Sequence, residues 1–213
     1  MAELKYTLIK HPVLLHHLTL LRRKETRPPE FRRILGEMAR LIAYEATQDL
    51  PLKQVAIDTP MEHMDRAPAI AEELVVVSIM RAGNGMLDGV LQALPFAQAG
   101  HIGMYRDKFV HATVEYFFKL PEAIEGRSIL LLDPLLATGD TAVASLKRLK
   151  EYGVGNIRLV SLLAAPEGVA KVNAQHPDVR IFTLSLERGL TDRGFLLPGL
   201  GDAGDRLYGT EKL

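Results

Sequence analysis

Short apolar runs and alternating segments along the chain predict its strands. Leu74–Ile79 and Ser128–Leu132 are almost entirely apolar and are bounded by turn residues, which is typical of parallel strands buried on both faces. The other expected strands are shorter or alternate between apolar and polar residues: one at 157–165, one at 179–185, a short one from His101 and another from Thr113.

Apolar residues three and four positions apart predict helices between these strands. The clearest helix extends from Thr26 to Leu50, with Thr26 as a capping residue, Pro28 and Pro29 in the first turn, and Pro51 at its end. Further helices are expected over 86–94, after Thr141 with Gly153 as the C-cap, and over 167–176.

Residues 1–27 mix polar and apolar side chains without a clear period. The pair His16-His17 is expected to be surface or packing residues rather than a metal site, because adjacent side chains point apart. The pair Arg22-Arg23 stands out only locally.

Strands that alternate with helices indicate an α/β protein with a doubly wound, mainly parallel sheet flanked by helices. Ligands of such sheets bind beyond the carboxyl ends of the strands. With 213 residues and 47% hydrophobic content, the chain can bury one core, so residues 1–213 are expected to form a single domain.

Composition and charge exclude several functional classes. The 26 basic and 26 acidic residues balance, and no basic run is present, which argues against a nucleic-acid partner. The chain has no cysteine, so disulfides and thiolate chemistry are excluded. No apolar run reaches the length of a membrane span and the first residues lack a signal-peptide core, so we expect a soluble, intracellular protein without a membrane partner.

The chemistry centres on Ser128 to Thr141, SILLLDPLLATGDT. A strand end that opens onto a helix is suited to phosphate, because Gly139 permits close backbone approach and the first-turn amides lack helical partners. Thr138 and Thr141 add hydroxyl donors, whereas the carboxylate of Asp133 suits the vicinal hydroxyls of a ribose. The segment therefore predicts a ribose 5-phosphate site; the alternative is an ordinary strand, turn and helix with a polar cap.

A second candidate anion site follows the strand 74–79. Arg81, Gly83 and Gly85 form a glycine-rich turn in which backbone amides and a guanidinium can converge on one group. The alternative is a tight turn that happens to contain an arginine.

The polar stretch after His101 predicts a mobile flap between two strands. Arg106 in this stretch is either a ligand-binding cation or a surface charge paired with Asp107.

The glycine-rich tail, residues 194–210, contains a G-x-G-x-x-G pattern at Gly199–Gly204. We reject a dinucleotide fingerprint because too few residues follow to complete a βαβ unit. The tail is instead expected to be a loop whose backbone is offered to a ligand.

These motifs together resemble one family. DPLLATGDT is similar to the phosphoribosyl-pyrophosphate (PRPP) motif of the type I phosphoribosyltransferases, and its Asp133-Pro134 pair resembles the uracil phosphoribosyltransferases. The R-A-G turn, the Y-R-D…V-E-Y-F-x-K-L-P stretch and the tail P-G-L-G-D-A-G-D-R resemble the same family in the same order, as does the amino-terminal stretch HPVLLHHLTLLRRKET.

The resemblance implies a type I phosphoribosyltransferase fold with a small hood and a flexible β-flap. It also implies an amino-terminal arm and helix (1–50), a flexible hood loop (105–119) and a base-recognition tail (186–213). The amino-terminal arm would pack around the core and between subunits.

Site residues also follow from the resemblance. It implies catalytic roles for Arg106, Asp133 and Asp202, and base contacts from Leu196, Gly201, Asp202 and Ala203, largely through their backbones. The implied PRPP-binding set is Arg81, Ala82, Gly83, Arg106, Asp133, Pro134, Leu135, Leu136, Ala137, Thr138, Gly139, Asp140, Thr141 and Asp202. The chain departs from the family at Asp140, where glycine is common, at Asn84, often leucine, and at Phe195, usually tyrosine.

The implied reaction converts uracil and PRPP to UMP and diphosphate, in pyrimidine salvage. The implied cofactor is Mg²⁺, bound through PRPP and water rather than by assigned protein ligands. A cytoplasmic homodimer or homotetramer, with GTP as a candidate activator, is also implied. Two other classes stay open: an RNA-binding regulator of this fold, which a salt-dependent RNA shift would reveal, and a nucleotide sensor, which would bind UMP without turnover.

Overall fold

The computed structural model describes residues 3–106 and 113–210. The main sheet contains β1 (Thr7–Leu8), β4 (Leu74–Met80), β5 (Gln98–Arg106), β6 (Thr113–Lys119), β7 (Ser128–Leu132), β9 (Ile157–Val160) and β11 (Arg180–Thr183). Their order is β1-β11-β9-β7-β4-β5-β6, and all neighbours are parallel except β5 and β6. The predicted mainly parallel sheet is confirmed.

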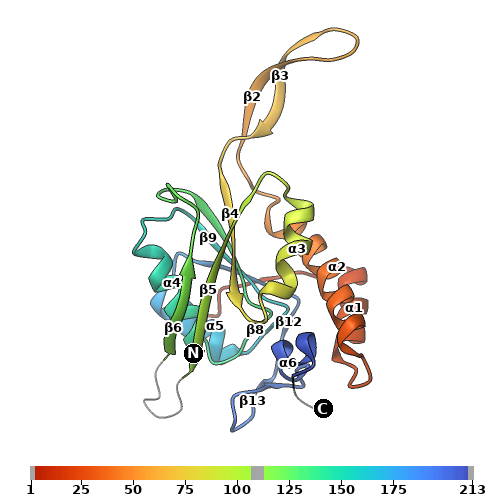
Figure 1. Ribbon diagram of the computed structural model, residues 1–213, viewed down its shortest axis with the longest axis vertical. Coiled ribbons are helices and arrows are strands. Elements are labelled where there is room, and N and C mark those ends of the chain that lie inside the picture. The colour runs from red at the N-terminus through yellow and green to blue at the C-terminus, as the bar shows by residue number, and fades with distance from the viewer. Residues whose placement is uncertain (1–2, 107–112, 211–213) are drawn as a thin grey trace.

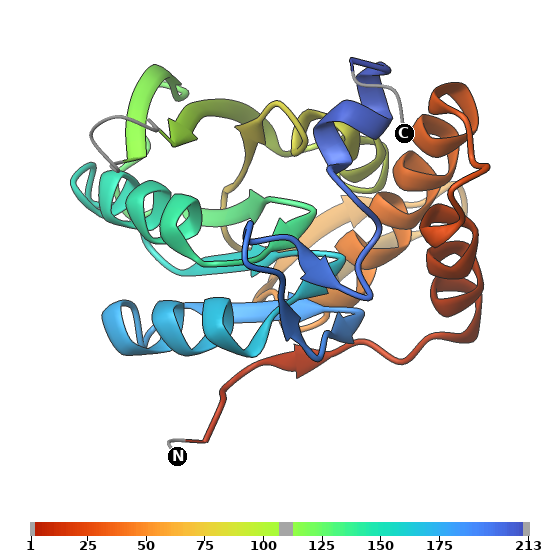
Figure 2. The same cartoon turned by 90° about the horizontal axis from the view of Figure 1, so that it is seen from below.

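Helices cover both faces of this sheet (Figures 1 and 2). The helices are α1 (Pro12–Arg22), α2 (Pro28–Ala46), α3 (Asn84–Ala93), α4 (Asp140–Lys150), α5 (Pro166–Gln175) and α6 (Ala203–Tyr208). Figure 2 shows α1 and α2 on the opposite side of the sheet from α4 and α5. Among the described residues, no helix combines the length and the apolar character needed to cross a membrane.

The alternation of side chains along the strands explains why both faces need a cover. Val76 of β4 and Leu130 of β7 belong to the core beneath α1, α2 and α3, whereas Val75 and Ile129 belong to the core beneath α4 and α5. Because successive residues of a strand point to opposite faces, an apolar run supplies both cores at once. The doubly wound arrangement follows directly from these runs.

Three smaller sheets complete the fold. The first joins β8 (Leu135–Leu136), β10 (Leu163–Ala164) and β12 (Ser185–Leu186), and the second pairs β13 (Gly189–Leu190) with β14 (Leu196–Leu197). The third is a hairpin of β2 (Leu52–Asp58) and β3 (His63–Ile70), which projects away from the body of the molecule (Figure 1).

The helix α1 and the β2–β3 hairpin were not expected from the sequence. Residues 12–22 form α1, whose buried Leu14, Leu18 and Leu21 have helical spacing, but further leucines on its exposed side obscure that stripe. The β2–β3 hairpin was also not expected, because most of its side chains are exposed and leave no alternating pattern.

Several predicted boundaries were wrong. Thr26 does not cap α2: the cap is Arg27, and the Thr26 hydroxyl donates to Leu20 O at 2.6 Å, which ties the end of α1 to the start of α2. The helix ends at Ala46, where Thr47 donates its hydroxyl to Ala43 O at 2.7 Å, before Pro51 is reached.

Other predicted elements are interrupted. The C-cap of α4 is Glu151, and Gly153 lies in the following turn at φ +66°. The strand predicted over 157–165 divides into β9 and β10, because Leu162 N donates to Pro134 O instead of continuing the main ladder. The strand predicted over 179–185 likewise ends at Thr183, and β12 begins at Ser185.

The tail is held by a buried carboxylate. Glu187 is 4% exposed and accepts two hydrogen bonds from Arg22, at 2.9 and 2.6 Å. It also accepts from the Ser185 hydroxyl and from Gly199 N, each at 2.7 Å. Burial alone would raise the pKa of Glu187, but these hydrogen bonds and the Arg22 charge lower its pKa to about 2. Glu187 therefore fixes the tail loop to α1.

A buried cation provides a second anchor for the tail. Arg206 of α6 is 4% exposed, and its guanidinium donates to the carbonyls of Leu21, Leu200, Arg23 and Thr26. Desolvation lowers the pKa of Arg206. Carbonyl dipoles thus replace a carboxylate as its partners and hold α6 against the end of α1.

Replacing Glu187 should destabilise the fold in a pH-dependent way. We expect Glu187→Gln to lower the free energy of unfolding by about 3 kcal/mol at neutral pH, because the buried Arg22 contact loses its countercharge. A depressed pKa stabilises the fold above the ordinary value of 4.5 and loses that effect as pH falls toward about 2. The wild-type advantage in urea unfolding should therefore shrink with acid.

Glu37→Gln is a suitable control for this experiment. Glu37 pairs with Arg33 at 2.7 Å on the same helix, but its side chain is 45% exposed, so its loss should cost under ~1 kcal/mol. Equal losses for the two variants at neutral pH would show that Glu187 is not an anchor.

Candidate active site

Two of the predicted turns lie side by side at one edge of the sheet. Ser78 of β4 pairs with Leu132 of β7, so the turn after Met80 and the turn after Leu132 leave the same edge. Gly83 lies so close to this edge that a Cβ there would be 2.5 Å from Leu132 O. Any side chain at Gly83 would therefore separate the two turns.

A cavity of about 210 Å³ opens between these turns and the tail. Its lining joins residues from four parts of the chain: Ile79, Met80, Arg81, Ala82, Met104, Asp133, Thr141, Asp202 and Gly204. Arg81, Ala82, Asp133, Thr141 and Asp202 belong to the predicted set, and the structure brings them together. Ile79, Met80, Met104 and Gly204 were missed, since apolar residues and a helical glycine carry no chemical signal of their own.

The tail closes over the turn that contains Arg81. The guanidinium donates to Asp205 at 3.0 Å and to the Thr210 hydroxyl at 3.3 Å, and the Tyr208 hydroxyl donates to Arg81 O at 3.3 Å. A hydrogen bond from Thr210 is the main cause that lowers the pKa of Asp205, with Arg81 adding to it. Asp205 was not in the predicted set, and it joins the tail to this turn.

Asp133 is the unusual acid of the cavity. Desolvation raises its pKa to about 7; the charge of Asp202 adds to the rise and a backbone hydrogen bond at Leu135 opposes it. Among the described residues, neither Asp133 nor Asp202 takes part in an ion pair. Two acids that lack an ion-pair partner make the cavity receptive to hydroxyl donors and to a cation.

The predicted phosphate loop has the expected backbone. Gly139 is the N-cap of α4 with a left-handed φ of +84°, which glycine adopts without strain. A Cβ at Gly139 would also lie 3.1 Å from Gly168 O of α5. Its neighbours Thr138 and Thr141 are partly exposed, and Thr141 reaches the cavity. The loop can therefore approach an anion closely.

Other members of the predicted loop can reach a ligand only through their backbones. Pro134 and Leu136 are buried, and Leu135 and Leu136 form β8. Ala137 is partly buried and offers no polar side chain.

The loop also contains an acid that is already engaged. Thr138 Oγ1 donates to Asp140 Oδ2 at 2.9 Å, and Lys171 of α5 forms an ion pair with Asp140 Oδ1. Lys171 was not in the predicted set, and it lies 31 positions away from its partner.

The residues predicted to recognise the base occupy the tail. Leu196 lies in β14 with a buried side chain, so only its backbone could meet a ligand. Gly201 is exposed at φ +81°, and Asp202 accepts from Asp205 N at 2.9 Å as the N-cap of α6, whose first residue is Ala203. Residues 194–210 were expected to be a loop, so β14 and α6 are corrections to that prediction.

Arg106 ends β5 at the same edge of the sheet, two residues after Met104 of the cavity. Strands β5 and β6 extend to Arg106 and from Thr113, so the predicted hood loop is partly a two-stranded ladder. Residues 107–112 of that loop lie outside the described residues.

A buried polar network supports the Arg81 turn from below. The Ser78 hydroxyl donates to Asn84 Oδ1 at 2.7 Å, and the Ser78 oxygen also lies 2.9 Å from His101 Nδ1. Because a hydroxyl has one proton, the His101 nitrogen is then the donor of the second bond. Asn84, where the family often has leucine, thus satisfies a serine that is fully buried.

The acidic residues of the cavity could bind a cation together with water and substrate oxygens, but they could not enclose it with protein ligands alone. No cluster of three acidic, histidine or cysteine side chains that could enclose a metal occurs among the residues that the structure describes. Mg²⁺ commonly takes one or two carboxylates and completes its shell with water and phosphate oxygens. The carboxylates of Asp133 and Asp202 fit that pattern.

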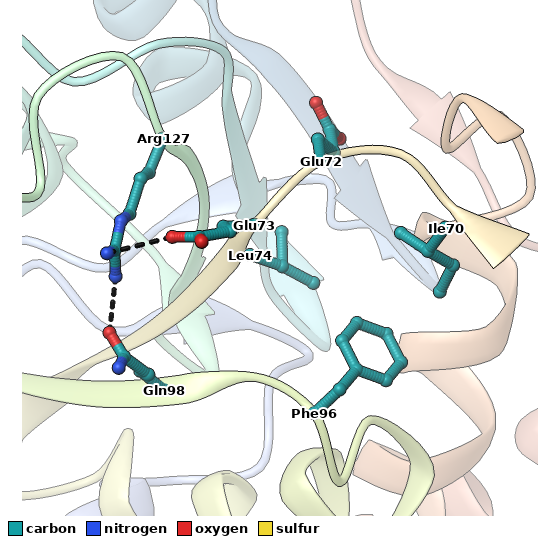
Figure 3. Close-up of a pocket in the computed structure, with 7 residues that line it drawn as sticks. All are labelled: Ile70, Glu72, Glu73, Leu74, Phe96, Gln98 and Arg127. Atoms are coloured by element: carbon teal, nitrogen blue, oxygen red, sulfur yellow. Dashed lines mark hydrogen bonds and ion pairs between the residues drawn. The ribbon is translucent and has the colours of Figure 1, made fainter. Parts of the chain in front are cut away.

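A larger cavity lies at the opposite edge of the sheet, near the starts of β4 and β5 (Figure 3). It measures about 500 Å³ and contains Glu72, Glu73 and Arg127. The Arg127 guanidinium pairs with Glu73 at 2.8 Å and donates to Gln98. Because its cation is already neutralised beside two acids, this cavity does not suit a phosphate.

Comparison with known proteins assigns the family. The sequence matches the family "Uracil phosphoribosyltransferase" over residues 8–210. A uracil phosphoribosyltransferase of Acidovorax sp. (strain JS42) is 51% identical over 203 residues, which is 95% of this chain and 97% of that protein. The corresponding protein of Agrobacterium fabrum is 47% identical over 205 residues, 96% of this chain and 98% of its own.

Solved structures agree. The AQ2163 protein from Aquifex aeolicus has a TM-score of 0.92 and 32% identity, covering 98% of this chain and all of that one. An adenine phosphoribosyl transferase from Trypanosoma brucei shares the fold at a TM-score of 0.51 and 14% identity, covering 82% of this chain and 70% of its own. The chain therefore has a type I phosphoribosyltransferase fold, and it belongs to the uracil phosphoribosyltransferase family.

Proposed function

We propose that this chain transfers the 5-phosphoribosyl group of PRPP to uracil in the cavity at the carboxyl edge of the sheet. The chain is a pentosyltransferase of pyrimidine salvage that makes UMP and diphosphate. The observation that carries the placement is the convergence of Arg81, Asp133, Thr141 and Asp202 on one cavity. They come from the turn after β4, the segment after β7, the first turn of α4 and the tail, so together they can contact different parts of the substrates.

We assign the ribose 5-phosphate to the α4 side of the cavity. The loop 137–141 would bind the 5-phosphate through its amides and the Thr138 and Thr141 hydroxyls, and Asp133 would accept hydrogen bonds from the ribose hydroxyls. The short path along the chain from Asp133 to Thr141 supports this assignment, since one sugar phosphate can contact both.

The diphosphate and the base would lie on the other side. Arg81, the backbone of Ala82 and Gly83, and Arg106 would bind the diphosphate, whereas Leu196, Gly201 and Ala203 would face uracil through their main chains. Amides that face the uracil O4 oppose the amino group of cytosine, which would leave buried donors unpaired. The contacts between α6 and the Arg81 turn support this arrangement, because they hold the tail next to that turn.

In this reaction the bond between ribose C1 and the diphosphate oxygen breaks and its electron pair leaves with diphosphate. A bond forms between C1 and uracil N1, and the N1 proton is released. The ribose carries positive charge in the transition state, so holding both ends and stabilising the departing diphosphate should dominate catalysis. In the proposed arrangement, Asp133 and Asp202 would lie on the side where that charge develops.

Mg²⁺ belongs to this proposal. Asp133 and Asp202 would hold it, in part through water, and when bound it would neutralise the diphosphate as a hard cation.

The remaining expectations rest on the family resemblance. We propose a cytoplasmic homodimer or homotetramer, which the exposed apolar residues Leu52, Ile57, Met61 and Met64 of the hairpin support as a contact surface. GTP as an activator is proposed from the resemblance alone, and initial rates with and without GTP would test it.

Binding of PRPP should release a proton from Asp133. Its pKa of about 7 in the free protein must fall when ribose hydroxyls or a cation require the carboxylate, so affinity should rise with pH up to about 7. Calorimetry in buffers of different ionisation enthalpy should find close to one proton released at pH 6 and fewer at pH 8. Asp133→Asn should remove this release and weaken PRPP binding by ~1.5–3 kcal/mol.

The substrate phosphate titrates near pH 6 as well, so the comparison with Asp133→Asn isolates the protein group. Proton release that persists unchanged in the variant would refute the ribose role of Asp133. In the absence of ligand, the free energy of unfolding depends on pH in the opposite direction to PRPP affinity. The raised pKa of Asp133 stabilises the fold in acid, and this contribution is lost as pH rises toward 7.

Arg106 should act on turnover rather than on nucleotide binding. We expect Arg106→Ala to lower kcat by about a hundredfold, the usual effect of removing one donor to transition-state charge. Binding of UMP, which lacks the diphosphate, should change little. Arg66→Ala on the exposed face of the hairpin is the matched control. Equal losses in kcat and UMP affinity would instead assign Arg106 to the nucleotide pocket.

A further inference from the structure

The phosphate loop of this chain contains a negative charge where its ligand is negative. Asp140 is the first residue of α4, next to the loop glycine at position 139. The Thr138 hydroxyl donates to its Oδ2 at 2.9 Å, so the carboxylate takes a donor that a phosphate would need. A phosphate dianion bound there would also be repelled by the carboxylate.

Lys171 of α5 forms an ion pair with the Asp140 carboxylate. Its ammonium pairs with Asp140 Oδ1, while the side chains of the lysine and the aspartate are 39% and 32% exposed. The pair is therefore close to the loop but open enough to rearrange.

The position of Lys171 is fixed by backbone packing. A Cβ built on Gly139 would lie 3.3 Å from Lys171 Cβ and 3.3 Å from Gly168 Cα. The base of the lysine thus packs against the loop glycine itself. Its contact with Asp140 follows from the way α5 crosses the start of α4.

We propose that Lys171 is a positioning residue for PRPP: it neutralises Asp140 and holds its carboxylate aside, so that the 5-phosphate can bind and take over the Thr138 hydroxyl. This inference rests on the proposed placement of the 5-phosphate over residues 137–141. It makes one distinctive statement, that Lys171 matters only because Asp140 is present.

Four proteins test that statement: wild type, Lys171→Met, Asp140→Gly and the double variant. Lys171→Met should raise the KM for PRPP and the inhibition constant of ribose 5-phosphate about fivefold, the scale of a partly exposed ion pair. Its kcat should change less than twofold, and Lys171→Arg should restore the wild-type KM. Asp140→Gly should lower the PRPP KM, and adding Lys171→Met to it should then change nothing.

The matched control is Lys150→Met. Lys150 also forms an ion pair, with Asp178 at 2.6 Å, but it is the last residue of α4. The KM for PRPP of this variant should therefore stay at the wild-type value. Thermal unfolding of each variant reports on folding separately.

Two results would overturn the inference. If Lys171→Met raises the KM for PRPP equally in the wild-type and the Asp140→Gly backgrounds, Lys171 binds the phosphate directly. If the KM rises in neither background, the ion pair of Lys171 and Asp140 is only a surface contact without a role in PRPP binding. Thr141→Val separates these outcomes from a failure of the proposed function. If that variant also leaves the PRPP KM unchanged, the 5-phosphate does not bind over residues 137–141; if it raises KM while Lys171→Met does not, only the role of Lys171 is lost.

Discussion

The parallel register between β4 and β7 is the constraint on which the candidate site depends. Pairing of Ser78 with Leu132 makes the two strands end together, so the chain must turn twice at the same place. Space there is so limited that a Cβ at position 83 would lie 2.5 Å from Leu132 O. A one-residue slip would move one turn away from the other and would exchange the two cores, since every side chain of β4 would change face.

The tail is held by buried charges in addition to the apolar core. Its Leu196, Leu200 and Leu207 belong to the core beneath α1, α2 and α3. The buried Glu187 and Arg206 add polar contacts to that packing. Charges out of water are costly, so these contacts contribute less to net stability than their number suggests. These contacts also fix the geometry of the tail. Their partners are backbone carbonyls, a backbone amide, the Ser185 hydroxyl and Arg22, and they hold the tail next to the Arg81 turn.

The sequence predicted those elements whose apolar and turn residues lie close together along the chain. The buried runs of β4 and β7, the stripe of α2 and the turns after both strands were predicted because each signal lies within a few residues. The β2–β3 hairpin escaped notice because its exposed side chains follow no pattern. Contacts such as Arg22 with Glu187, 165 positions apart, leave no local trace at all. Asp205 and Lys171 were not predicted for the same reason: their partners, Arg81 and Asp140, are distant in the sequence.

Three of the carboxylates in and around the site, Glu187, Asp140 and Asp133, differ in how their charge is balanced. Glu187 has a permanent cation and a depressed pKa, so it is committed to structure. Asp140 has a cation on a flexible stem at a partly exposed position, so its contact can rearrange. Asp133 has no ion-pair partner in the part of the chain that the structure describes, and its pKa is raised. A desolvated acid without a countercharge gains most from a ligand that brings hydroxyl donors or a cation, and a ribose with Mg²⁺ brings both.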